Sequence, residues 1–243
     1  MENLTKNVFS NDPTALGKAI TLIESTKKEH QVLADNLLRN CLGNKTESVR
    51  IGITGIPGVG KSTFIENFGK LLVNKGMRVA VLTVDPSSNE TKGSILGDKV
   101  RMETLSKEKN AFIRPTPTSG SLGGVARKTR ETIILLEAAG YDVILIETVG
   151  VGQNETTVRE MTDFFLLLKL PGAGDELQGI KRGVMEMADA IAINKADGHN
   201  INTAETAKVE FTTALHLFAP KDNGWSPKVL TCSALENKGL QPI

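Results

Sequence analysis

Apolar and polar residues alternate in a regular order from residue 49 onward, and this order predicts an α/β fold. Short apolar runs of strand length are followed by stretches in which apolar residues recur every three or four positions, as in amphipathic helices. Strands that alternate with helices form mainly parallel sheets with helices on both faces and ligands at the carboxyl ends of the strands. The predicted strands are 49–54, 78–84, 111–114, 142–148, 164–169, 190–194 and 228–231, and the predicted helices are 61–74, 124–139, 179–188 and 203–218.

The first part of the chain has only helical periodicity. Apolar residues at helical spacing over 14–42 predict two helices, separated by a polar break at 25–28. We therefore assign residues 1–46 to an N-terminal helical segment and residues 47–243 to the α/β domain. The short segment after the last predicted strand cannot supply a helix to cover that strand. We therefore expect either that the chain is a fragment of a longer protein or that a partner covers this face.

Residues 55–62, with the sequence GIPGVGKS, lie between a predicted strand and a predicted helix, where a phosphate-binding loop belongs. Glycines let successive backbone N–H groups point at phosphate oxygens, while Lys61 reaches the β- and γ-phosphates and Ser62 binds Mg²⁺. A Gly-rich turn can match part of this pattern by chance, but the strand before it and the helix after it favour nucleotide binding. The fold we predict is therefore that of a P-loop NTPase. The residues expected at the phosphates are Gly55, Gly58, Val59, Gly60, Lys61, Ser62 and Thr63.

Two further motifs indicate which base is bound. Residues 194–197, with the sequence NKAD, follow a predicted strand, and the carboxylate of Asp197 can accept hydrogen bonds from the N1–H and 2-amino groups of guanine. Adenine has neither donor and would leave the carboxylate unpaired. We expect the stem of Lys195 to lie along the base, and Asn194 to tie this loop to the phosphate-binding loop. The turn Ser233, Ala234 and Leu235 follows the last strand and offers a backbone N–H to the guanine oxygen. GTP is the predicted ligand.

Three carboxylates are candidates for the Mg²⁺ site. Asp85 and Glu147 each follow an apolar strand, and Asp98 lies in the glycine-rich segment 93–101. Asp85 is a candidate either for the Mg²⁺ shell or for positioning the attacking water. The longer side chain of Glu147 is compatible with a contact through water, because Mg²⁺ gives up its waters reluctantly. Gly150 is expected to donate its N–H to the γ-phosphate. Asp85 also fits a turn before a proline, and Asp98 also fits a solvated loop. The loop 119–124 either approaches the ligand or is a plain turn.

Hydrolysis by such a site depends mainly on positioning and charge neutralisation. The residue after Gly150 is Val151, at the position where efficient small GTPases have a glutamine that orients the attacking water. An aliphatic side chain cannot orient water, and Gln153 is a remote substitute. We therefore expect slow intrinsic hydrolysis that a partner stimulates.

Composition narrows the environment and the partners. The 243 residues include 29 Lys and Arg against 28 Asp and Glu, so net charge gives no reason to expect nucleic acid or an anionic membrane as partner. Two cysteines in a chain of this length are typical of free thiols in a reducing compartment, and no run is apolar enough to cross a bilayer. We expect a cytoplasmic protein without a transition-metal site.

Several longer strings resemble those of one family, the ArgK/MeaB GTPases, to which the human cobalamin protein of the MMAA type is related. The resemblance extends from about residue 16 to the end of the chain. It rests on residues 85–88 (DPSS), 93–99 (GSILGDK), 119–124 (SGSLGG), 147–153 (ETVGVGQ) and 174–181 (GDELQGIK). Members of this family are GTPases that act as chaperones of adenosylcobalamin-dependent methylmalonyl-CoA mutase or its relatives, gating cofactor delivery and protecting the mutase.

The resemblance implies roles for matching residues. It places Lys61 and Ser62 at phosphate and Mg²⁺, the three carboxylates Asp85, Asp98 and Glu147 around the metal, and Asn194 and Asp197 at guanine. It also implies a switch that relays the nucleotide state to the mutase, made of Gly174, Asp175, Glu176, Gln178 and Lys181. The family's closing helix and C-terminal dimerisation arm are absent here, which puts the usual homodimer in doubt. Two alternatives are a kinase or ATPase linked to lysine, arginine and ornithine transport, and a nucleotide-binding module without turnover.

Overall fold

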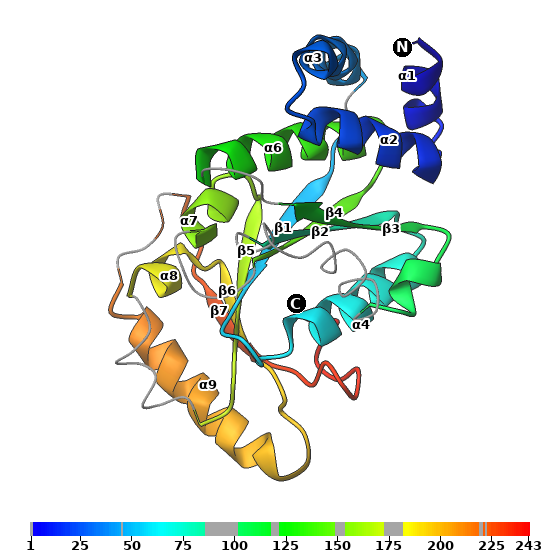
Figure 1. Cartoon of the computed structure of the whole chain (residues 1–243). Helices are drawn as coiled ribbons and strands as arrows, with labels where there is room; N and C mark the ends of the chain where they lie inside the picture. Colours follow the sequence, from blue (N-terminus) through cyan, green and yellow to red (C-terminus); the bar gives the residue numbers. More distant parts are fainter. Residues whose placement is uncertain are drawn as a thin grey trace.

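The computed structural model of the chain describes residues 2–44, 46–85, 102–117, 122–148, 154–172, 182–218, 221 and 223–243. Its centre is one sheet of seven parallel strands in the order β3-β2-β4-β1-β5-β6-β7 (Figure 1). This arrangement confirms the predicted α/β sandwich with a parallel sheet. The strands are β1 (Val49–Thr54), β2 (Val79–Asp85), β3 (Ala111–Pro117), β4 (Val143–Thr148), β5 (Phe164–Lys169), β6 (Ala190–Ile193) and β7 (Lys228–Thr231).

Strand register brings the carboxyl ends of β1 and β4, and those of β6 and β7, to one edge of the sheet. Ile53 of β1 pairs with Glu147 of β4, and Ile193 of β6 pairs with Thr231 of β7. The chain order reverses on either side of β1, whose neighbours are β4 and β5. In open parallel sheets such a reversal opens a crevice at the carboxyl edge, where ligands bind. The phosphate-binding loop leaves β1 at this position.

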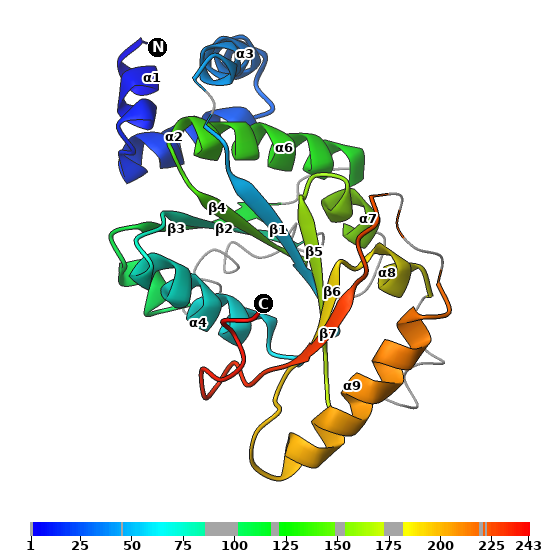
Figure 2. The same ribbon diagram turned by 180° about the vertical axis from the view of Figure 1, so that it is seen from behind.

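Helices cover both faces of the sheet (Figures 1 and 2). On one face, α4 (Lys61–Asn74) packs its buried Phe64, Ile65 and Phe68 against β1, β2 and β5. The 3₁₀ turn η1 (Leu105–Lys107) and the segment after β7 complete this layer. The other face is covered by α6 (Leu122–Ala138), α7 (Asn154–Arg159), α8 (Arg182–Met187) and, after the turn η3 (Gly198–Asn200), α9 (Ile201–Leu215).

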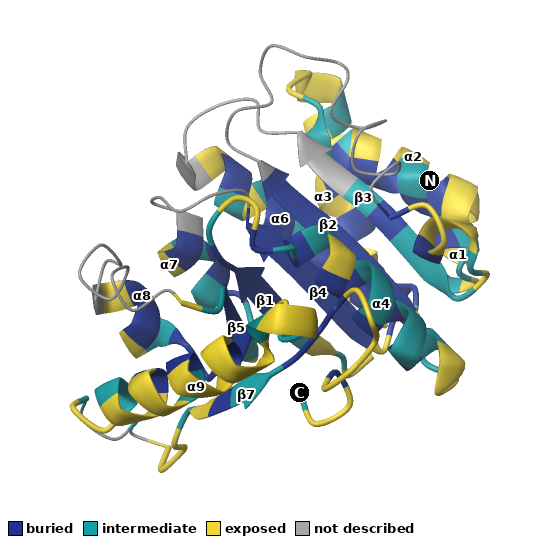
Figure 3. Ribbon diagram, turned by 90° about the horizontal axis from the view of Figure 1, so that it is seen from below, coloured by how far each residue is buried: buried dark blue, intermediate teal, exposed yellow. Residues whose placement is uncertain are grey.

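The N-terminal segment forms three helices that pack outside α6: α1 (Glu2–Phe9), α2 (Pro13–Glu24) and α3 (Lys28–Leu42). Their buried residues, among them Leu16, Ile20 and Leu37, belong to one hydrophobic cluster. The same cluster includes residues of α6 and of the face of β2 and β4 that α6 covers. Figure 3 shows buried positions both in the strands of the sheet and in α2. The division at residues 46 and 47 stays a prediction, since the helices share a core with the sheet.

The pattern of the sequence located nearly all of these elements. Every predicted strand is present within one residue at its start, and the helix predicted over 61–74 has those bounds. The structure adds α1 and α7, which the pattern did not predict, because they are only 8 and 6 residues long and mostly polar. The helix predicted over 179–188 is described as α8 from Arg182 only. No helix in the described ranges is both long and apolar enough to span a membrane.

Candidate nucleotide-binding site

The phosphate-binding loop curls between β1 and α4 with three glycines at positive φ, 152° at Gly55, 80° at Gly58 and 95° at Gly60. At Gly60 the conformation and the space both require glycine. A Cβ there would lie 2.7 Å from Nδ2 of Asn194, and φ falls in the left-handed region. Glycine at this position therefore lets the loop close. Helix α4 begins directly after the loop, at Lys61. A helix N-terminus of this kind presents backbone N–H groups to an anion.

Lys61 folds its side chain back over this loop. Its ammonium Nζ donates to the carbonyl oxygens of Gly55, at 2.8 Å, and Ile56, at 3.3 Å, and the residue is only 9% exposed. Burial of a cation is costly unless hydrogen bonds compensate for lost water. The backbone carbonyls hold the ammonium at the loop, in the place where the sequence predicts the phosphates.

Asn194 is the hub of the site and is 1% exposed. Its amide Nδ2 donates to the carbonyl of Val59 at 2.8 Å, and its Oδ1 accepts from the backbone N–H of Ala234 at 3.0 Å. The first contact is the tie to the phosphate-binding loop that the sequence predicted. One side chain at the end of β6 thus joins the loop after β1 to the turn after β7.

Asp197 and the turn after β7 are joined directly. Its carboxylate Oδ2 accepts from the hydroxyl of Ser233 at 2.5 Å, and that hydroxyl accepts from the N–H of Glu236 at 3.1 Å. Ser233 and Lys238 also exchange two backbone hydrogen bonds, which close the turn into a small loop. The two segments predicted from separate motifs to read the base therefore form one unit. Lys195, within the first segment, has the left-handed conformation, with φ 59°.

Asn67 adds a contact to this unit that the sequence motifs did not reveal. It lies two turns into α4, and its Nδ2 donates to the carbonyl of Ala234 at 2.8 Å. The asparagine stands at a half-buried position of an amphipathic helix, where sequence alone suggests only a surface amide. Cys232, on the other side of the turn, is buried, and burial raises the pKa of its thiol to about 12. Neither Asn67 nor Cys232 is marked by a sequence motif.

At the phosphate end, Glu147 and Ser62 come together. The hydroxyl of Ser62 donates to Oε1 of Glu147 at 3.4 Å, and the glutamate is 6% exposed. Beside them Thr148 donates to Oγ1 of Thr54 at 2.9 Å, which ties the end of β4 to the end of β1. Two oxygen donors thus lie side by side at the start of α4, as a hard cation requires.

The remaining predicted residues lie at the limit of the described chain or outside it. Asp85 is the last residue of β2, whose preceding Val84 pairs with Thr148, so its backbone reaches the same edge. Outside the described residues lie Asp98, Gly150, Val151, Gln153, the stretch 118–121 and the switch predicted at Gly174, Asp175, Glu176, Gln178 and Lys181. The roles of all these residues stay predictions.

Comparison with known proteins decides the family. The model of the family "Methylmalonyl Co-A mutase-associated GTPase MeaB" matches residues 16–243 of this chain. The chain belongs to the MeaB family of GTPases. It is therefore a GTPase of the guanine-nucleotide-binding kind, as the NKAD segment at Asp197 predicted.

Individual proteins that resemble this MeaB protein support the same family assignment. Escherichia coli GTPase ArgK is 52% identical over 238 residues, which cover 98% of this chain and 72% of ArgK. The mouse protein "Methylmalonic aciduria type A homolog, mitochondrial" is 48% identical over 99% of this chain and 60% of its own length. The crystal structure of a protein named "LAO/AO transport system kinase" superimposes with a TM-score of 0.84 and 41% identity, covering 99% of this chain and 71% of that one. The resemblance to the ArgK/MeaB family is thereby confirmed.

Proposed function

We propose that this chain binds GTP with Mg²⁺, hydrolyses it slowly, and uses the change of nucleotide state to assist an adenosylcobalamin-dependent mutase of the methylmalonyl-CoA type. One observation carries the proposal most directly. Asn194 hydrogen-bonds the phosphate-binding loop at Val59 and the turn at Ala234, so that the phosphate end and the base end form a single site. A nucleotide is a ligand that has both phosphates and a base, one group for each end.

At the base, Asp197 selects guanine. Its carboxylate is fixed by the hydroxyl of Ser233 through one oxygen, Oδ2. Hydrogen bonds to a charged group are stronger than neutral ones, so a base with two donors gains most from this carboxylate. Adenine would place its own N1 lone pair against it, which accounts for the preference for guanine over adenine.

At the phosphates, the backbone N–H groups at the start of α4 and the ammonium of Lys61 neutralise negative charge. Ser62 and Glu147 supply the oxygen donors that Mg²⁺ prefers, which fits the metal, and Asp85 reaches the same edge of the sheet. When bound, Mg²⁺ stabilises charge that develops on the transferred phosphoryl group. The residues of the chain bind and orient the nucleotide, and we assign no general base among them. Asp98 and Gly150 complete the proposed set.

The intrinsic rate is expected to be slow. Val151 follows Gly150 at the position where a glutamine would orient the attacking water, and a valine side chain has no hydrogen-bonding group. A partner that supplies or orders such a group would accelerate hydrolysis. The proposed client is a mutase, since the family is described as mutase-associated and the mouse relative is named for methylmalonic aciduria. We place the protein in the cytoplasm and propose that it gates cofactor loading and protects the mutase.

The switch that would relay the nucleotide state is proposed to be the loop of Gly174, Asp175, Glu176, Gln178 and Lys181. In the sequence these residues come between β5 and α8, and α8 contacts α7, the helix that follows the proposed γ-phosphate-sensing segment after Glu147. The alternative function is that of a transport-system kinase, for which the related protein of known structure is named. A carboxylate fixed in the base site, as at Asp197, argues against ATP as the ligand of a kinase.

The test is GTP turnover by the purified chain, alone and with an adenosylcobalamin-dependent methylmalonyl-CoA mutase. We expect slow release of phosphate by the chain alone and at least about tenfold stimulation by the mutase, because positioning dominates this reaction. Lys61→Ala provides the blank, since it removes the phosphate-binding ammonium. Val151→Gln is expected to raise the intrinsic rate and to reduce the stimulation. Fast turnover without the mutase, or no response to it, would refute the proposed coupling.

A further inference from the structure

The turn after β7 is clamped at both polar groups of Ala234. Its N–H donates to Asn194 and its carbonyl accepts from Nδ2 of Asn67, at 3.0 and 2.8 Å. Ala234 is 2% exposed, whereas the next residue, Leu235, is 75% exposed at the tip of the closed loop. The N–H of Ala234 is therefore already used inside the protein. A backbone donor that this turn offers to a ligand is therefore to be sought at another residue.

The N–H of Leu235 is the candidate. Unlike the neighbouring N–H groups of Ala234 and Glu236, it has no hydrogen-bond acceptor among the described residues. It belongs to the same peptide unit as the carbonyl of Ala234, and the chain has no cis peptide in its described part. In a trans peptide the C=O and N–H bonds point in opposite directions within one plane. The side chain that holds the carbonyl therefore also sets the direction of the N–H.

We propose that Asn67 is a positioning residue for base recognition, which holds the carbonyl of Ala234 so that the N–H of Leu235 points at the 6-oxygen of guanine. The inference rests on the proposed function, since it assumes a guanine nucleotide at this edge. The turn is already placed against Asp197 through the hydroxyl of Ser233, so both edges of the base are within one rigid unit. Asn67 itself touches protein only.

The same helix thereby serves both ends of the nucleotide. Lys61 begins α4 at the phosphate-binding loop, and Asn67 lies on that helix two turns later. A shift of α4 when phosphate is bound would move the carbonyl of Ala234 and redirect the Leu235 N–H.

The test compares GDP with its 6-thio analogue by isothermal titration calorimetry. The analogue keeps the N1–H and 2-amino groups that Asp197 reads, but its sulfur is a weak acceptor. The unaltered chain is expected to prefer GDP, and Asn67→Leu is expected to lose most of this preference, with GDP affinity falling about tenfold. Asn74→Leu, an exposed asparagine at the end of the same helix, is expected to keep the preference.

The second part of the test removes the backbone N–H of residue 235 directly. Leu235→Pro lacks the N–H, whereas Leu235→Ala retains it, so the difference between the two reports on the hydrogen bond and not on the side chain. Combining Leu235→Pro with Asn67→Leu should add little to the loss, as expected for two changes that act on one contact. The inference is overturned if the unaltered chain binds both nucleotides equally, or if Asn67→Leu weakens both to the same extent. Failure of the proposed function differs, since the unaltered chain would then bind ADP as well as GDP.

Discussion

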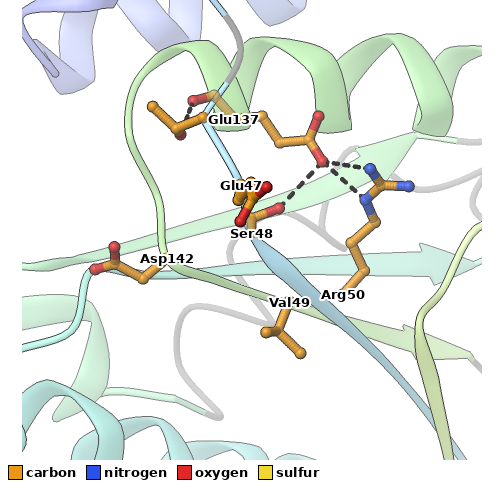
Figure 4. Close-up of a pocket in the computed structure, with 7 residues that line it drawn as sticks. Glu47, Ser48, Val49, Arg50, Glu137 and Asp142 are labelled. Carbon is orange, nitrogen blue, oxygen red and sulfur yellow. Dashed lines mark hydrogen bonds and ion pairs between the residues drawn. The ribbon is translucent and has the colours of Figure 1, made fainter.

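The two edges of the sheet each contain a buried polar hub, and the hubs are built differently. At the carboxyl edge Asn194 connects loops that follow three strands, and the groups around it include Lys61 and Asp197, which are suited to a ligand. At the amino edge Glu137, which is fully buried, accepts from Ser48 at 3.1 Å and pairs with Arg50 at 2.7 Å (Figure 4). A cavity of about 590 Å³ lies beside it. We propose that the first hub organises a binding site, whereas the second attaches a segment.

The amino-edge hub fixes the connection between the N-terminal helices and β1. The hydroxyl of Thr46 donates to the backbone carbonyl of Glu137 at 2.6 Å. Ser48, directly before β1, and Arg50, in β1, both donate to the carboxylate of Glu137. All of these contacts join residues 46–50 to the end of α6. Burial of a polar group therefore does not by itself mark a functional site, because buried Glu137 connects protein segments to one another.

Removing the carboxyl-edge hub should have the largest effect on binding. Asn194→Ala leaves the carbonyl of Val59 and the N–H of Ala234 without their partner, and each unsatisfied buried group costs about 1 to 3 kcal/mol. We expect GDP affinity, measured by calorimetry, to fall at least about 100-fold. Asn194→Asp keeps the acceptor for Ala234 but loses the donor to Val59, so its effect should be intermediate. An unchanged GDP affinity in Asn194→Ala would show that the loops do not depend on this hub.

Removing the amino-edge hub should instead affect stability. Glu137→Ala leaves Arg50 without its buried partner and is expected to lower the free energy of unfolding by about 3 kcal/mol, measured in urea. The preference for GDP over ADP should be unchanged in the folded variant. Glu160→Ala is the matched control, because the pair of Glu160 and Arg130 is more than half exposed and contributes little. A change in base preference on loss of Glu137 would contradict the separation of the two edges.

The smallest expected effect is on the reactivity of the two cysteines, which lie in different regions of the molecule. Burial raises the pKa of Cys41, in the N-terminal layer, to about 11 and that of Cys232, in the base-reading turn, to about 12. A raised thiol pKa leaves about one thiolate in a thousand or fewer at pH 8, so both should react slowly with a disulfide reagent and faster as pH rises. In single-cysteine variants made by Cys→Ala substitution, GDP should slow the reaction of Cys232 only. Equal protection of both would indicate a global effect of the nucleotide.

Much of this molecule could be predicted from its sequence because the fold and the site rest on local patterns. The strands are apolar runs, and residues 55–62 and 194–197 carry their chemistry in consecutive residues. From the sequence, Asp197 and Ser233 could be expected only to lie near each other, because each follows the end of a strand. Their hydrogen bond depends on the register of β6 and β7.

What the sequence could not indicate depends on contacts between distant segments. Asn67 and Glu137 are single polar residues within amphipathic helices, and nothing around them in the sequence distinguishes them from surface residues. Their partners, Ala234 and Arg50, are 167 and 87 residues away along the chain. α1 is likewise stabilised by packing on α2 and α3, which its own composition does not indicate.

The central claim is that a carboxylate at the carboxyl edge reads guanine in a site continuous with the phosphate-binding loop. Titration of GDP, ADP and xanthosine diphosphate into the unaltered chain and Asp197→Asn, with Mg²⁺ present, tests it most directly. We predict tight binding of GDP, at least about 100-fold weaker binding of ADP, and a shift of the variant toward xanthosine diphosphate, whose 2-oxygen can accept from the new amide. Equal binding of GDP and ADP by the unaltered chain, or no change in preference on substitution, would contradict the account.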